Sequence, residues 1–367
     1  MEVPAGEWGR HAGPAGPLRD ASLSAGFVAQ AADKRMLAVD IRTPEGGDVL
    51  RDLLRTTDVF VEGLRPGVVA RAGFDEASLR ALNPRLVLAS ITGFGQDGPF
   101  STWPAYDHVI QAMSGLMSVT GTPESAPLRV GPPVVDYVTG LYAAFAVMAG
   151  LAARDKTDAF QRVDVGMRDC AFAMMSSVIS EHVNTGTIPK PAGNVAASGS
   201  PSSGVFQTKD GLLALAANQE RQFGQLCSAL GRPSLVSDER YAEPAVRRAN
   251  AAGLRVELAA VFAQRTAAEW EEVLMAAGVP AGRVRTIPEA VAEPQTAARG
   301  LLHEVSSELG RNLSVVGAAF KLNGSPLHPM AAPRSVGADS AAILAELGYD
   351  ADRIAEMARQ GIIATAG

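Results

Sequence analysis

The first third of the chain alternates short runs rich in β-branched residues with amphipathic stretches. The runs are residues 37–41 (LAVDI), 58–62 (DVFVE) and 85–92 (RLVLASIT), and helical patterns begin at Pro44 and near residue 75. Strands that alternate with helices are typical of βαβ units and therefore of a parallel sheet. We expect an α/β fold whose large domain contains a Rossmann-like parallel sheet.

The remaining pattern predicts a second, smaller α/β domain. Residues 187–204 are rich in Pro, Gly, Ser and Asn, which indicates a linker or a mobile loop. A hairpin is expected around Asp210-Gly211, where Asp-Gly suits a tight turn. We predict a large domain of residues 1–190 plus 320–367, and a linker and small domain of residues 191–319. Further predicted elements are helices at 105–116, 134–153, 169–184, 219–230, 243–263 and 266–277, strands at 161–167 and 282–287, a hairpin at 303–317 and two C-terminal helices.

Composition argues against several classes of function. The net charge is −6 without a Lys/Arg block, so we expect neither nucleic acid nor an anionic membrane as a partner. The two cysteines form no CxxC motif and the five histidines are scattered, so we expect no disulfide framework, no metal site and a cytoplasmic location. The longest apolar stretch, residues 137–153, is shorter than the ~20 residues of a bilayer crossing and predicts a buried helix.

Two predicted strands run into glycine-bearing loops, GLRPG (63–67) and GFGQDGP (93–99). In open α/β sheets, ligands bind at the carboxyl edge of the strands. Arg65 in the first loop could pair with a phosphate, because a guanidinium offers two parallel donors to phosphate oxygens; a solvated surface arginine is the alternative. The second loop fits GxGxxG, but Pro99 and the absence of an acidic strand end argue against dinucleotide binding.

Asp169 lies where the strand at 161–167 passes directly into a helix. A carboxylate can act as a nucleophile toward an activated acyl group and form a covalent intermediate. The first turn of a helix keeps such a carboxylate ionised and can stabilise an oxyanion. An ordinary helix-capping role is the alternative for this position.

Several motifs, in order, resemble the class III coenzyme A transferases, the CaiB/BaiF family. The resemblance rests on KRMLAVDIRTPEG (34–46), EGLRPG (62–67), SITGFGQDGP (90–99), AYDHVIQAMSG (105–115), LRVGPPVVDYVTGLYAA (128–144), VDVGMRDCAF (163–172), GVFQTKDGLLALAANQERQF (204–223) and PQTAARGLL (294–302). These segments extend over nearly the whole chain. The resemblance implies an enzyme that moves coenzyme A (CoA) from an acyl-CoA to a small carboxylic acid.

The resemblance also implies roles for individual residues. Asp169 would form a mixed anhydride with the acyl donor and then an aspartyl-CoA thioester, from which the acceptor carboxylate collects the CoA. Tyr106, Asp107 and Asp136 would line the substrate cleft, with helix capping as the alternative for the two aspartates. Gly199, in the run from Ala197 to Ser200, would belong to a loop that folds over the intermediate. The resemblance assigns CoA binding to Arg65, Gly93, Phe94 and Gly95.

The family resemblance further implies an interlocked homodimer that uses CoA as a substrate and needs no other cofactor. Relatives carry a strand-helix-strand segment before the point that Met1 matches, so that segment is expected to be missing. Two other functions stay open at this stage. One is an α-methylacyl-CoA racemase, although Tyr106 stands where racemases carry a histidine. The other is a truncated CoA-binding relative without catalytic activity.

Overall fold

A computed structural model describes residues 1–366 apart from 197, 309, 311 and 328. Its contacts divide the chain into two compact units. The first consists of Met1–Pro104, Thr139–Gly166 and Pro288–Gly367, and the second of Ala105–Val138 and Met167–Ile287. These bounds differ from the domain boundaries expected at residues 190 and 320, which stay a prediction.

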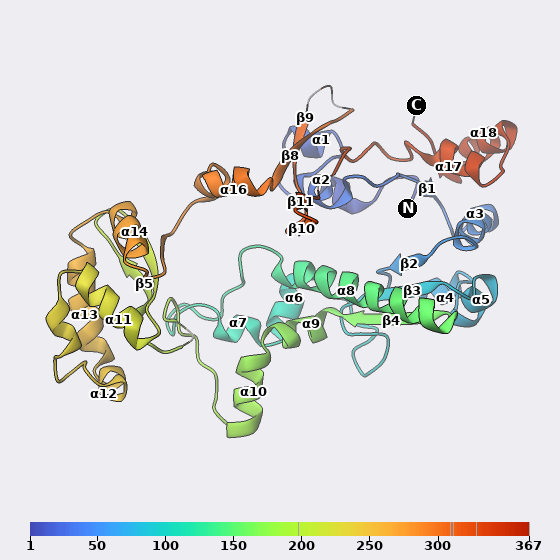
Figure 1. Cartoon of the computed structure of the whole chain (residues 1–367). Helices are drawn as coiled ribbons and strands as arrows, with labels where there is room; N and C mark the ends of the chain where they lie inside the picture. The colour runs from blue at the N-terminus through green and yellow to red at the C-terminus, as the bar shows by residue number, and fades with distance from the viewer. Residues whose placement is uncertain (197, 309, 311, 328, 367) are drawn as a thin grey trace. The chain divides into compact units, whose positions relative to one another are not determined.

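The predicted parallel sheet is confirmed in the first unit by strands β2 (Val59–Glu62), β3 (Val87–Thr92) and β4 (Gln161–Gly166), in that order. Glu62 aligns with Ser90, and Ser90 aligns with Asp164. One face of the sheet packs against helix α8 (Val134–Thr157) (Figure 1). This close packing depends on Gly150, because a Cβ there would lie only 3.0 Å from Val87.

Short helices and their caps build the layer on the opposite face. Helix α3 (Pro44–Leu54) begins at the Thr43 cap, helix α4 is Val68–Arg71, and helix α5 (Glu76–Leu82) begins at the Asp75 cap. Each capping oxygen accepts a backbone N–H that the first helical turn cannot otherwise satisfy. The buried side chains of this layer form one apolar cluster: Leu50, Leu54, Phe74, Leu79, Leu86, Leu88 and Phe160.

The expectation that residues 37–41 join this parallel sheet is wrong. They contribute strand β1 (Ala38–Val39), which pairs antiparallel with strand β12 (Ile363–Ala364) near the C-terminus. The reason is a separate apolar core, in which Val39 and Ile363 pack with side chains of helices α17 (Ser340–Glu346) and α18 (Ala351–Arg359). Burial in that core determines the partner of β1.

The expectation of a buried helix at residues 137–153 is also wrong. Helix α8 has 24 residues and is long and apolar enough to cross a membrane by length and composition alone, a test that core helices of soluble proteins also pass. Only 22% of its most apolar window is buried in this chain. Leu141, Phe145 and Met148 are 72%, 74% and 64% exposed. The helix packs on the sheet along one side and leaves an apolar face uncovered.

The second unit contains two groups of elements. The first group is α6 (Asp107–Met113), α7 (Leu116–Val119), α9 (Met167–Met174) and α10 (Ser176–Thr185). The second is an antiparallel sheet of β5 (Ser203–Gln207), β6 (Leu212–Ala216) and β7 (Ala281–Arg283) with helices α11 (Glu220–Ala229), α12 (Pro244–Ala249), α13 (Ala251–Phe262) and α14 (Ala267–Ala276). The hairpin at Asp210-Gly211 is thus confirmed, and one apolar core with Phe223, Leu254 and Trp270 holds the second group together.

The remaining elements of the first unit surround a further small core. The predicted hairpin at 303–317 is confirmed as β8 (Leu302–Ser306) and β9 (Asn312–Val316), whose Val305 and Val315 pack with Phe27. The other elements are η1 (Trp8–His11), α1 (Pro17–Asp20), α2 (Ala25–Ala31), α16 (Pro294–Arg299), β10 (Lys321–Leu322) and β11 (Ser325–Pro326).

Candidate active site

Asp169 is the third residue of helix α9, which follows strand β4 without an intervening loop residue. The buried end of β4, Val165 and Gly166, fixes the point at which the chain turns into the helix. The Asp169 side chain is exposed, and it has no hydrogen-bond or ion-pair partner among residues 1–366 as far as the structure describes them. The carboxylate is therefore accessible to a reactant.

Tyr106 and Asp107 begin helix α6, which packs against α9 within the second unit. Tyr106 is the N-cap residue and is 61% exposed, with its ring parallel to that of His108 at a centroid distance of 6.4 Å. Asp107 is buried, at 7% exposure. The structure thus brings the Tyr106-Asp107 pair and Asp169 onto two helices in contact.

Asp107 connects helix α6 to the start of helix α8. Its Oδ2 accepts the backbone N–H of Val135 at 2.8 Å and that of Asp136 at 3.4 Å. Its Oδ1 accepts a hydrogen bond from Gln111 Nε2 at 2.6 Å, and Gln111 Oε1 accepts the N–H of Val130 at 2.9 Å. A buried charge is stable only when hydrogen bonds compensate its desolvation. Asp107 is therefore a structural carboxylate that caps α8.

Asp136 is the third residue of α8, beside this capped end. Its side chain keeps an exposed surface, yet neighbouring protein atoms partly desolvate the carboxylate. This desolvation and, to a smaller extent, the negative charge of Asp107 raise the pKa of Asp136 above its usual range. Carboxylates whose pKa is shifted by burial and a specific charged neighbour are candidates for functional groups.

Gly199 lies in the loop that precedes β5, also in the second unit. It has a φ of +65° and open space around its Cα, so a left-handed backbone accounts for glycine here. Its neighbour Ser198 donates a hydrogen bond to Asn218 Oδ1 at 2.6 Å. Ala197 lies outside the described residues. The expected role of Gly199 stays a prediction.

The remaining candidate residues, Arg65, Gly93, Phe94 and Gly95, belong to the first unit. The loop after β3 has left-handed conformations at Gly95 (φ +86°) and Gly98 (φ +82°). The Phe94 ring packs edge-on against Phe100 at a centroid distance of 5.8 Å, and Phe100 packs on Trp103 at 4.3 Å. An aromatic cluster therefore supports one end of this loop.

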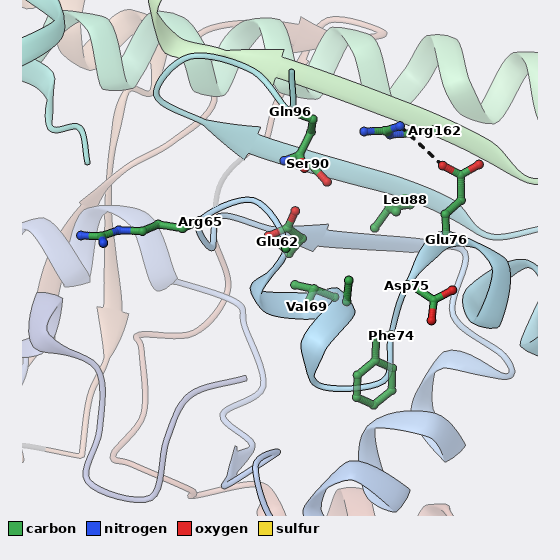
Figure 2. Close-up of a pocket in the computed structure, with 12 residues that line it drawn as sticks. Glu62, Arg65, Val69, Phe74, Asp75, Glu76, Leu88, Ser90, Gln96 and Arg162 are labelled. Atoms are coloured by element: carbon green, nitrogen blue, oxygen red, sulfur yellow. Dashed lines mark ion pairs between the residues drawn. The ribbon is translucent and has the colours of Figure 1, made fainter. Parts of the chain in front are cut away.

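A cavity of about 180 Å³ lies between β2, β3 and the helices α4 and α5 (Figure 2). Its lining is Glu62, Arg65, Gly67, Val69, Ala70, Phe74, Asp75, Glu76, Leu88, Ser90, Gln96 and Arg162. Arg162 is 3.6 Å from Glu76, whereas Figure 2 shows the Arg65 guanidinium extending away from Glu62. Arg65 is exposed and has no ion-pair partner among the described residues, so its charge is available to an anionic ligand.

Sequence reasoning missed three polar residues near this cavity: Ser90, Gln96 and Asp164. Ser90 is buried, and Gln96 Nε2 is a buried donor without a hydrogen-bond partner in the described part of the chain. The Asp164 carboxylate accepts the backbone N–H of Gln96 at 3.0 Å. The alternation of apolar and polar residues along β3 and β4 was the available signal. It places Ser90 and Asp164 on the same face of the sheet, because they are aligned.

Acidic and histidine side chains do not gather as a metal ion would require: the described residues contain no cluster of three or more His, Cys, Asp or Glu side chains suited to one. The second unit offers exposed and partly desolvated carboxylates next to helix starts. The first unit, taken by itself, offers an arginine that lies beside a cavity and has no ion-pair partner among the described residues. Such groups suit the transfer of an activated acyl group and the binding of an anionic carrier.

Comparison with known proteins agrees with this chemistry. The family model described as CoA-transferase family III matches residues 1–340. A succinate–glutarate CoA-transferase of Agrobacterium fabrum is 36% identical over 318 residues, 86% of this chain and 78% of that protein. An acetyl-CoA:oxalate CoA-transferase of Acetobacter aceti is 35% identical, over 77% of this chain and 72% of that protein.

A solved structure gives the same result for the fold. The crystal structure of a CaiB/BaiF family protein from Brucella suis superposes with a TM-score of 0.82 at 31% identity, and the match covers 94% of this chain and 90% of that one. The expected family and the expected α/β fold are thereby confirmed. The chain belongs to CoA-transferase family III and is a CoA-transferase.

Proposed function

We propose that this enzyme moves CoA from an acyl-CoA donor to a small carboxylic acid through a covalent intermediate on an aspartate. The carboxylate oxygen attacks the thioester carbonyl, which forms a mixed anhydride and releases the CoA thiolate. The thiolate then attacks the aspartyl carbonyl, which gives an aspartyl-CoA thioester and the donor acid. An acceptor carboxylate repeats the two steps in reverse order and leaves as the new acyl-CoA, so the aspartate is regenerated.

Two aspartates of the second unit could carry the intermediate. The family resemblance predicts Asp169, whose exposed carboxylate on α9 is open to a donor. We propose Asp169 as the nucleophile, because its exposed carboxylate in the first turn of α9 can meet a donor without giving up a partner in the described chain. Asp136 is the alternative, since its partly desolvated carboxylate lies beside the buried Asp107.

Arg65 and the loop of Gly93, Phe94 and Gly95 are proposed to bind CoA. Arg65 supplies a guanidinium without an ion-pair partner in the described chain, which suits a phosphate of the carrier. Gly95 supplies a left-handed backbone position without a Cβ, which lets a ligand approach the main chain closely. Tyr106 is proposed to contact the acyl substrate, since its exposed ring lies at the start of α6.

We also propose a homodimer. The face of α8 formed by Leu141, Phe145 and Met148 is apolar and largely exposed in one chain. Exposed apolar faces of this kind mark protein interfaces in soluble proteins. A second copy as the occupant is consistent with the assembly that the family resemblance implies. Such an interface would also account for an apolar helix in a chain that we expect in the cytoplasm.

A transfer assay tests the proposed function. Succinyl-CoA, glutaryl-CoA and acetyl-CoA are each paired with succinate, glutarate or oxalate, because relatives are named for these acids, and the new acyl-CoA is measured by mass spectrometry. We expect turnover with at least one pair and a loss of at least about 10³-fold in kcat for Asp169→Ala. Asp136→Ala is the matched variant. Loss with Asp136→Ala alone would transfer the role to that residue, and no turnover with any pair would oppose the proposal.

A further inference from the structure

The carboxylate of Asp164 holds the loop that follows β3. Asp164 Oδ2 accepts the backbone N–H of Gln96 at 3.0 Å. The same carboxylate lies against Gly95, where a Cβ would be 3.9 Å from Oδ2. Asp164 is aligned with Ser90 on β3, so the hydrogen bond joins the glycine loop to the neighbouring strand β4.

Little else restrains this part of the loop. Within the described residues, the bond to Asp164 is the one hydrogen bond that residues 94–97 make. The φ of +86° at Gly95 adds a conformation that glycine adopts freely, so the backbone itself does not rigidify the turn. The aromatic contacts begin at Phe94 and continue at Phe100 and Trp103. Between these points, the loop conformation depends on Asp164.

The anchored residue faces the cavity of the first unit. Gln96 lines that cavity, and its Nε2 is a buried donor without a partner among the described residues. Figure 2 shows the Gln96 side chain beside Ser90. A buried amide donor without an acceptor is costly unless a ligand or water supplies one. Fixing the backbone of Gln96 also fixes where this donor points.

From this geometry we infer that Asp164 is a positioning residue, which holds the 93–96 loop in the conformation that binds CoA. The inference rests on the proposed function, because it takes this loop as part of the CoA site. A charge-assisted hydrogen bond from a carboxylate to an N–H is stronger than one between neutral groups. Without this hydrogen bond the loop samples other conformations. The apparent affinity for CoA then falls in proportion to the fraction of molecules whose loop is in the binding conformation.

The test compares Asp164→Ala with Asp164→Asn in the full-length protein. CoA affinity is measured by titration calorimetry, and the amide exchange of residues 93–100 by mass spectrometry without ligand. We expect Asp164→Ala to weaken CoA binding about tenfold, the effect of one such hydrogen bond, and to speed exchange in that segment. Asp164→Asn keeps an acceptor oxygen but not the charge, so both quantities should lie between those of wild type and those of Asp164→Ala.

Asp352→Ala, which removes an exposed carboxylate from helix α18, is the control for a change of charge alone. Wild-type affinity in Asp164→Ala, or an equal loss in Asp164→Asn, would overturn the inference. If the wild-type protein binds no CoA, the proposed function fails and the affinity part of the inference fails with it. If amide exchange of residues 93–100 is unchanged in Asp164→Ala, Asp164 does not hold the loop, whatever the result for CoA affinity.

Discussion

The carboxylate of Asp107 accepts the backbone N–H of Asp136 with an oxygen–nitrogen distance of 3.4 Å. Through this contact and the stronger one to Val135 at 2.8 Å, a buried side chain of α6 caps α8. The same carboxylate places a negative charge beside the side chain of Asp136 and contributes to its raised pKa. One residue thus stabilises the helix start and perturbs the neighbouring carboxylate, which is the alternative candidate for the nucleophile.

Replacing Asp107 by alanine should destabilise the protein. The change removes the cap of α8 and leaves the Gln111 amide without its acceptor. Losing a cap of this kind costs about 1–2 kcal/mol in the free energy of unfolding, and an unsatisfied buried donor adds to it. Urea unfolding followed by circular dichroism measures the change. Asp169→Ala, which removes an exposed side chain without a partner in the described chain, should stay within about 0.5 kcal/mol of wild type.

Replacing Asp136 by asparagine should stabilise the protein at neutral pH. The pKa of Asp136 is raised in the folded state, so the ionised form opposes folding above that pKa. Its neutral form is favourable at acid pH, and that advantage is lost as the pH rises through the folded pKa. We expect the Tm of Asp136→Asn to exceed that of wild type by a few °C at pH 7, with the difference vanishing near pH 3. A lower Tm at pH 7 would contradict the assigned pKa direction.

Replacing Arg65 by alanine should weaken acyl-CoA binding with little effect on the chemical step. The guanidinium has no partner among the described residues, so its removal leaves the fold intact. We expect KM for the acyl-CoA to rise about tenfold while kcat changes less than about threefold. Arg65→Lys keeps the charge but not the bidentate donors and should give an intermediate KM. An unchanged KM in Arg65→Ala would remove this residue from the CoA site.

A charge on the exposed face of α8 should break the proposed dimer. Phe145→Glu introduces a carboxylate at a side chain that is 74% exposed in one chain and that we expect to be buried against a second copy. Light scattering after gel filtration should report a dimer for wild type and a monomer for the variant at micromolar concentration. Val256→Glu alters a side chain that is 70% exposed on α13 and should leave the dimer intact. A monomeric wild type would oppose the dimer.

Local sequence patterns predicted the helices and strands better than they predicted which of these elements pair or pack together. The strands β2, β3 and β4 coincide with their apolar runs within two residues, because period and burial agree in a parallel sheet. The pairing of β1 with β12 was not predictable, since each strand has two residues and they lie more than 300 residues apart. The uncovered face of α8 was not predicted, because an apolar helix has the same sequence pattern whether its own chain or a partner covers it.

In the candidate site, too, individual residues could be predicted but their contacts could not. Asp169 could be named from the sequence as an acidic residue at a helix start, and Asp107 and Asp136 could be named from the family resemblance. That Asp107 caps the helix of Asp136 depends on packing between α6 and α8, 28 residues apart. The Gln96–Asp164 hydrogen bond likewise joins residues that are 68 positions apart. Patterns of charge identify carboxylates, whereas their burial and partners follow from tertiary structure.

The central claim is a covalent intermediate on an aspartate, and intact-protein mass spectrometry tests it most directly. The protein is mixed with each acyl-CoA that supports turnover, quenched with acid, and mapped by peptide sequencing, with hydroxylamine as the reagent that releases the adduct. We predict an adduct of acyl or CoA mass on the peptide that contains Asp169, which is absent in Asp169→Ala and present in Asp136→Ala. An adduct on Asp136 would reassign the residue, and turnover without any adduct under acid quench would contradict the covalent mechanism.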